Sequence, residues 1–239
     1  MQSFIHSKPF NLNSKNQGEK MSDNRFFNRA VWKQKAMAFV VRSHRHLWGK
    51  NNEDPQAFLF THGLKNQFIK DALIGWNKFG QTRSIKNWGI ETNLKKDEKL
   101  FLASGIVIPF IVKKELKSIF IHPYDESQDN KTTIIPGSVT PTMVLGEKKE
   151  KVAVIQNIFD GLFLFQELKD TCCIIIHPDP KFVLDLHLNA MLKNADTVLI
   201  LSSEKKEFTE KKSLFPDVQD HCFYAYQSQD EAKEHCLKN

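Results

Sequence analysis

The chain has 239 residues, of which 41% are hydrophobic and 26% charged, a composition typical of a soluble globular protein. No apolar run approaches the roughly 20 residues needed to cross a bilayer, and residues 1–20 lack the apolar core of a signal peptide, so we expect a cytoplasmic protein with no membrane partner. The net charge of +6 is uneven: residues 1–50 carry +8, which leaves −2 for the rest. A basic end of this kind suits a polyanionic partner such as nucleic acid, or it forms a solvated face.

The first predicted elements are a leader and a long helix. Residues 1–20 are polar and rich in Asn, Ser and Lys, which predicts a disordered leader. Residues 23–48 contain no Gly or Pro and predict a helix. The apolar residues at roughly helical spacing, which we expect to face the core, are Phe27, Val31, Ala38 and Val41.

Shorter elements follow. Residues 55–60 and 66–73 predict two short helices, and Gly63 suits the carboxyl cap of the first. Residues 106–112 and 116–121 are strand-like and are joined by Lys113-Lys114-Glu115, so we expect an antiparallel hairpin. These segments predict a mixed α/β amino-terminal subdomain over residues 21–147.

Beyond residue 147 the pattern changes to strands alternating with helices. Apolar strands are expected over 152–155, 172–176 and 197–201, with helices over 159–168 and 182–193 between them, and a last short helix over 230–237. Continuous apolar strands alternating with helices indicate a mainly parallel sheet covered on both faces. We therefore expect a second, α/β domain over residues 148–239.

The four cysteines predict buried thiols rather than a metal site. Cys172 and Cys173 are adjacent within an apolar run, and Cys222 and Cys236 lack the paired spacing of a zinc site. If helices cover both faces of the sheet, both Cys172 and Cys173 are expected to be buried.

Several segments, taken together and in order, resemble the bacterial-type DNA primase core, a Toprim-domain family. The resemblance covers roughly residues 25–205. The matching segments are FLFTHGL at 58–64, with His62 where arginine is usual, IKDALIG at 69–75, NWGI at 87–90, GIVIP at 105–109, IIPGS at 134–138 and VAVIQNIFDG at 152–161.

The resemblance also shows where this sequence departs from the family. The family holds Mg²⁺ with a glutamate after the first Toprim strand and an Asp-x-Asp pair after a later one. Here these positions carry Gln156, followed by Asn157, and then Ser202 and Glu204; Asp160 is retained. Because neutral Gln156 and Ser202 are poor ligands for a hard cation, the resemblance implies a degenerate Toprim site with no bound metal and no catalytic residues.

Two other functions remain open. A metal site relocated to Asp160, Asp179 and Glu204 would give an active, Mg²⁺-dependent primase or nuclease, so whether the chain is an enzyme is left undecided. A fold kept only as a protein-interaction scaffold is the other reading.

The order of the parallel strands also predicts that His177 lies with Gln156 and Ser202 at the carboxyl rim of the sheet.

The leading hypothesis is a primase-derived protein that binds single-stranded DNA or RNA, or a replication protein, without polymerising. Phe26, Phe79 and Trp76 lie near basic residues and could stack on bases, although core packing is the stronger expectation. The candidates for phosphate contacts are Arg25, Arg29, Lys33, Arg42, Arg45, Lys65, Lys70 and Arg83.

Overall fold

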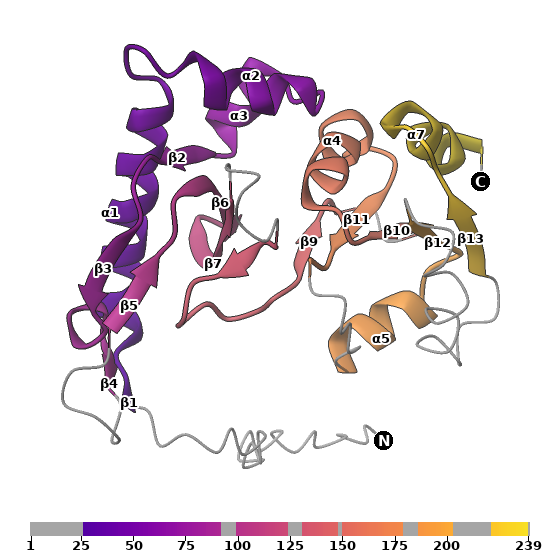
Figure 1. Cartoon of the computed structure of the whole chain (residues 1–239). Helices are drawn as coiled ribbons and strands as arrows, with labels where there is room; N and C mark the ends of the chain where they lie inside the picture. Colours follow the sequence, from indigo (N-terminus) through magenta and orange to yellow (C-terminus); the bar gives the residue numbers. More distant parts are fainter. Residues whose placement is uncertain are drawn as a thin grey trace, which may run out of the picture.

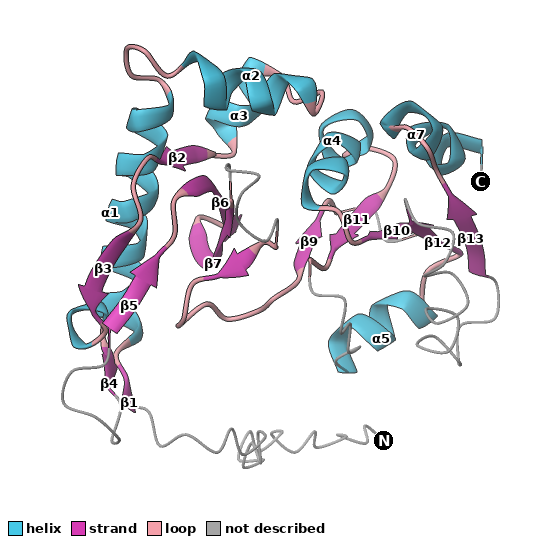
Figure 2. Ribbon diagram, viewed as in Figure 1, coloured by secondary structure: helices cyan, strands magenta, loops and turns pink. Residues whose placement is uncertain are grey.

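The computed structural model describes residues 26–91, 99–123, 131–147, 150–178, 186–202 and 221–238. Two sheets with flanking helices lie side by side (Figure 1). The chain passes from the first sheet to the second through a loop that leads into β9 (Figure 2). The described elements of the first part are β1 (Phe26–Phe27), α1 (Arg29–Leu47), α2 (Glu53–Thr61), α3 (Asn66–Asp71), β2 (Gly75–Asn77), β3 (Gln81–Ser84), η1 (Lys86–Trp88), β4 (Ile90–Glu91), β5 (Lys99–Leu102), β6 (Gly105–Val112), β7 (Glu115–His122) and β8 (Thr133–Ile134). Those of the second part are β9 (Met143–Leu145), β10 (Lys151–Ile155), α4 (Ile158–Leu168), β11 (Cys173–Ile176), α5 (Leu186–Lys193), β12 (Thr197–Ser202), β13 (His221–Ala225) and α7 (Gln229–Lys238).

The first part is built on an antiparallel sheet of order β2-β6-β7-β8. The predicted hairpin is confirmed: β6 and β7 pair antiparallel, and Lys113 and Lys114 both take positive φ, 49° and 65°, as a two-residue turn between twisted strands requires. The helix cap is confirmed too, since Gly63 follows α2 with φ +70°. The short strand β2 runs so close to α1 that a Cβ on Gly75 would collide with the backbone of Ser43.

The predicted core stripe of α1 is wrong. The helix begins at Arg29, where the side chain of Asn28 accepts a hydrogen bond from the amide of Val31, and it buries Trp32 and Phe39. Phe27 is 41% exposed and lies before the helix, and Ala38 is exposed. The larger aromatic side chains remove more apolar surface from water than Val or Ala, so their face of the helix packs on the sheet.

Two strand pairs in the first part were not predicted. β1 pairs antiparallel with β4, and β3 pairs antiparallel with β5, each as a separate two-stranded ribbon. β3 (QTRS) contains no large apolar residue, so it lacks the alternation that marks a half-buried strand.

The second part is a five-stranded sheet of order β13-β12-β10-β11-β9. β10 pairs in parallel with both β11 and β12, which confirms the predicted parallel neighbours; the unpredicted β13 adds a further parallel strand and β9 an antiparallel edge. The side chains of Cys172 and Cys173 are fully buried, as expected for a sheet with both faces covered. α4 and α7 lie on one face and α5 on the other (Figure 1).

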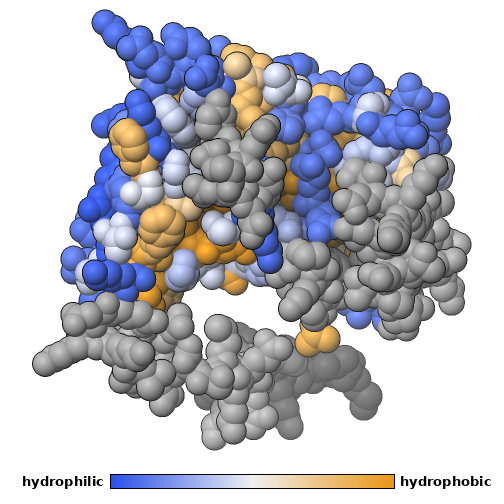
Figure 3. Space-filling view, in the orientation of Figure 1, coloured by the Kyte–Doolittle hydropathy of each residue, from blue (hydrophilic) through white to orange (hydrophobic). Residues whose placement is uncertain are grey.

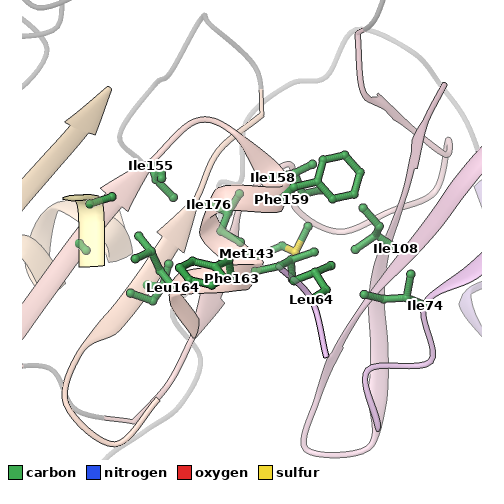
Figure 4. Close-up of a cluster of buried hydrophobic side chains, with 14 of the residues drawn as sticks. Leu64, Ile74, Ile108, Met143, Ile155, Ile158, Phe159, Phe163, Leu164 and Ile176 are labelled. Carbon is green, nitrogen blue, oxygen red and sulfur yellow. The ribbon is translucent and has the colours of Figure 1, made fainter. Parts of the chain in front are cut away.

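One hydrophobic cluster joins the two parts. It contains Leu64 and Ile74 from the first part and Ile155, Phe163 and Ile176 from the second, and Figure 4 shows the cluster running from one part to the other. The amide of Lys65 donates a hydrogen bond of 2.6 Å to the side-chain oxygen of Gln166, so α4 forms the seam. The predicted division into residues 21–147 and 148–239 therefore runs through a shared core.

Among the described helices, none has the length and apolar content that a bilayer span requires. The expected leader over residues 1–20 lies outside the described residues.

Candidate functional site

The carboxyl rim of the parallel sheet brings together the positions that the primase resemblance singled out. Ile155 pairs with Ile176 on one side and with Leu201 on the other, so Gln156, His177 and Ser202 follow at the same rim, as predicted. The imidazole Nδ1 of His177 lies 2.6 Å from the hydroxyl of Thr142. At the ends of these three strands Gln156 supplies an amide, Ser202 a hydroxyl and His177 an imidazole, and none of the three is a carboxylate.

Asp160 is the one acid of this rim that the structure describes. Its carboxylate is nearly buried, at 9% exposure, and it accepts hydrogen bonds from the hydroxyl of Tyr226 at 2.7 Å and from the amide of Gln229 at 2.8 Å. Asn157, not Asp160, caps α4: its side-chain oxygen accepts from the amides of Phe159 and Asp160. The carboxyl-terminal segment thus occupies both oxygens of Asp160.

These residues do not fit a Mg²⁺ site. Neutral Gln156 and Ser202 supply no charge, so Asp160 is the one carboxylate among these positions in the described chain, whereas Mg²⁺ gives up its water only to well-placed carboxylates. Within the described ranges, no group of three or more His, Cys, Asp or Glu side chains could hold a metal ion. Asp179 and Glu204, the other acids of the relocated site, lie outside the described residues.

Two histidines sit in an aromatic cluster at the seam between the parts. The ring of His62 stacks on Phe159 with centroids 4.5 Å apart, and His122 meets the same ring edge-on at 4.8 Å. Burial lowers the pKa of His122 to about 4, and the neighbouring His62 adds to this effect. Burial also lowers the pKa of His62, partly offset by the negative charge of Asp160. Burial therefore favours the neutral form of both imidazoles.

Several predicted phosphate contacts are engaged within the protein. The guanidinium of Arg29 donates to the carbonyl of Gly137 at 2.6 Å and lies 4.5 Å from the ring centroid of Trp32; desolvation lowers its pKa. Lys33 pairs with Glu115 at 2.7 Å. These two side chains hold α1 to the β6–β7 hairpin and its following turn.

Two further candidates also have partners inside the fold. Lys65 pairs with Glu167 at 2.6 Å, and the ammonium of Lys70 lies 4.8 Å from the ring centroid of Trp48. The remaining described candidates are exposed. Arg83 donates to the side-chain oxygen of Gln81, which also lies 3.5 Å from Arg42, while Arg45 makes no ion pair or side-chain hydrogen bond among the described residues. Arg25 lies outside the described residues.

The β3–β5 ribbon carries the most exposed aromatic rings of the described chain. Phe79, in the loop before β3, is 67% exposed and Phe101, on β5, is 63% exposed. Phe101 lies against the loop that carries Phe79, because a Cβ on Gly80 would lie 2.9 Å from the ring of Phe101. Of the aromatic residues considered for stacking, Trp76 is buried at 9% exposure, and the side chain of Phe26 lies outside the described residues.

Cations and a hydrogen-bond network accompany these rings. The ammonium of Lys78 lies 5.4 Å from the centroid of Phe79. The amide of Asn77 donates to the carbonyl of Ala103 at 2.6 Å and accepts from Gln81 at 3.1 Å, which fixes the loop against β5. Sequence reasoning missed Phe101; the alternation of exposed and buried residues along β5 was the available signal. Figure 3 shows hydrophobic side chains among hydrophilic ones on the face of the molecule that carries β3 and β5 in Figure 1.

The fold can be compared with known proteins at this point. No family model matches the chain, and no curated protein does. Solved structures do. A DnaG primase catalytic domain bound to single-stranded DNA matches at 10% identity with a TM-score of 0.64, covering 88% of this chain and 78% of that one. A DnaG catalytic core matches at 12% identity (TM-score 0.60, 87% and 79%), and the E. coli primase catalytic core at 8% (0.58, 88% and 75%).

At these identities the similarity establishes the fold alone. It spans both sheets, since nearly nine-tenths of the chain is covered. The expectation drawn from the segment order is therefore confirmed at the level of architecture: the chain has the fold of a DNA primase catalytic core, with an amino-terminal α/β part joined to a Toprim-like sheet.

Proposed function

We propose that this protein binds single-stranded nucleic acid on the β3–β5 ribbon and does not carry out metal-dependent nucleotidyl transfer. The observation that carries the proposal is the pair of exposed rings, Phe79 and Phe101, with the cation Lys78 5.4 Å from the centroid of Phe79; Arg83 is a second cation on β3. Unpaired bases stack on exposed aromatic rings, and cations alongside track the backbone phosphates.

The single-stranded ligand is favoured over a duplex for a physical reason. A ring gains about 1–3 kcal/mol per stacked base, and only an unpaired base offers its face without first breaking a stack. A primase catalytic domain of the same fold has been solved with single-stranded DNA, which supports the same ligand class here.

The absence of polymerisation rests on the carboxyl rim. Gln156 and Ser202 stand where the family places carboxylates, and Asp160 accepts hydrogen bonds from Tyr226 and Gln229. The alternative of a relocated metal site needs Asp160 as a ligand, and this side chain is 9% exposed and held by the carboxyl-terminal segment.

The test is fluorescence anisotropy with a labelled single-stranded oligonucleotide. Phe79→Ala with Phe101→Ala is expected to weaken binding by about tenfold or more, as the loss of stacking predicts. The matched control is Phe60→Ala, because Phe60 is also an exposed phenylalanine, at 44%, but lies on α2. Equal loss in the control, or no binding by the unaltered protein at low salt, would overturn the proposal.

A further inference from the structure

The outward face of α1 carries a groove that the fold itself does not use. Its volume is about 540 Å³, its floor is formed by Met37, Ala38 and Val41, and Arg42 and Arg45 stand along it. The inward face of the same helix buries Trp32, Ala36, Phe39, Val40 and Leu47 against the antiparallel sheet. A second, smaller apolar strip therefore exists on α1, in which Ala38 is exposed and Met37 and Val41 are half-buried.

Among the described residues, basic side chains and no acidic ones line the groove. The 19 residues of α1 include no Asp or Glu, while Arg45 and His46 are exposed at the carboxyl-terminal end of the groove. Arg45 has no ion pair or side-chain hydrogen bond among the residues that the structure describes. Within the described chain, the groove therefore carries the unpaired positive charge of Arg45 beside an apolar floor.

We infer that this groove docks an acidic amphipathic helix of a partner protein. Apolar side chains of such a helix, spaced three and four residues apart, would lie over Ala38 and Val41, and its carboxylates would face Arg42 and Arg45. This inference goes beyond nucleic-acid binding, because it concerns a second surface and a second class of ligand.

A nucleic acid suits the groove less well. The one aromatic side chain that lines the groove in the described chain is His46, at its end. The floor of Met37, Ala38 and Val41 offers no ring on which a base could stack and no charge for a phosphate. Complementary charge with apolar contact is the pattern of a protein interface, where charges steer the encounter and buried apolar groups hold it.

The test uses the full chain and a synthetic helical peptide of about 15 residues, long enough to hold a helix, with Leu on one face and Glu beside it. Ala38→Asp places a carboxylate on the groove floor and is expected to weaken peptide binding by about tenfold. Its control is Ala30→Asp, the same change at an exposed position of α1 outside the groove.

A charge reversal sharpens the result. Arg45→Glu is expected to weaken binding of the acidic peptide and to favour a version with Lys in place of Glu, whereas Lys35→Glu, on α1 but outside the groove, leaves the preference unchanged. Fluorescence anisotropy of the labelled peptide gives each affinity.

Three outcomes of these experiments would overturn the inference. No binding of the acidic peptide at about millimolar concentration, or equal effects in groove and control variants, overturns the inference. So does loss of oligonucleotide binding in Ala38→Asp, since the groove would then belong to the nucleic-acid surface. The variants Phe79→Ala and Phe101→Ala test the ribbon separately, so the two proposals fail independently.

Discussion

The imidazole of His62 lies nearly flat on the ring of Phe159, with an interplanar angle of 14° and centroids 4.5 Å apart. His62 comes from the end of α2 and Phe159 from the start of α4, so this stack joins the two parts of the molecule. His122 approaches the same ring at 4.8 Å. Two neutral imidazoles therefore form part of the seam, and protonating either one places a charge among aromatic rings.

We predict that acid weakens the fold through these histidines. The folded-state pKa of His122 is about 4, below its ordinary value of 6.5, so the unfolded chain binds the proton more readily. Stability is then fully present above pH 6.5 and is lost as the pH falls from 6.5 towards 4. The loss is expected to be on the order of 1 kcal/mol after solvent screening of a partly exposed group.

Urea unfolding at several pH values between 8 and 5 measures this effect. His122→Gln is expected to flatten the pH dependence, and the control His46→Gln, an exposed histidine at the end of α1, to leave it unchanged. A steeper loss of stability in His122→Gln than in the unaltered protein would contradict the prediction.

Arg29 is predicted to stabilise the fold. Its guanidinium donates to the carbonyl of Gly137 and packs on Trp32, so Arg29→Ala is expected to lower the free energy of unfolding by about 1–3 kcal/mol. Arg29→Lys is expected to lower the free energy of unfolding as well, because an ammonium cannot reproduce the planar array of donors of a guanidinium. The control Arg45→Ala, at an exposed position, is expected to change stability by less than about 0.5 kcal/mol.

Metal binding is predicted to appear only when the carboxylates are restored. The unaltered protein is expected to bind no Mg²⁺ at its carboxyl rim at millimolar concentration, while Gln156→Glu with Ser202→Asp is expected to bind it, since ligand charge sets these affinities. Isothermal titration calorimetry measures both. Binding by the unaltered protein, or a folded double variant that binds none, would show that these positions are not the equivalents of the family's acids.

The salt dependence of oligonucleotide binding reports the number of phosphates neutralised. For single strands the log–log slope is about −0.7 per phosphate, so contacts from Lys78 and Arg83 alone give about −1.4. Lys78→Ala is expected to flatten the slope by about 0.7, and Lys33→Ala, whose cation is paired with Glu115, to leave it unchanged. Anisotropy titrations over a range of NaCl concentrations measure the slope for the unaltered protein and for each variant.

Much of the second part could be predicted from sequence because its strands are buried on both faces. Four consecutive apolar residues in β10, for example, have no exposed side to confuse the pattern. On α1 the predicted stripe included Ala38, and only packing against the sheet decided that Trp32 and Phe39 lie inward and Ala38 outward. The ribbon site was partly missed because Phe101 lies against Gly80 and the loop of Phe79 only through the pairing of β3 with β5, which the sequence did not predict.

The shared hydrophobic cluster between the two sheets also governs how the molecule comes apart. Leu64 and Ile74 on one side, and Ile155 and Phe163 on the other, are buried by one another's elements. Separating the halves would expose these side chains to water, so neither half can open without weakening the other. The seam therefore couples the unfolding of the two halves, and we expect a chain divided near residue 147 to yield two fragments with exposed apolar surfaces, which aggregate or recombine.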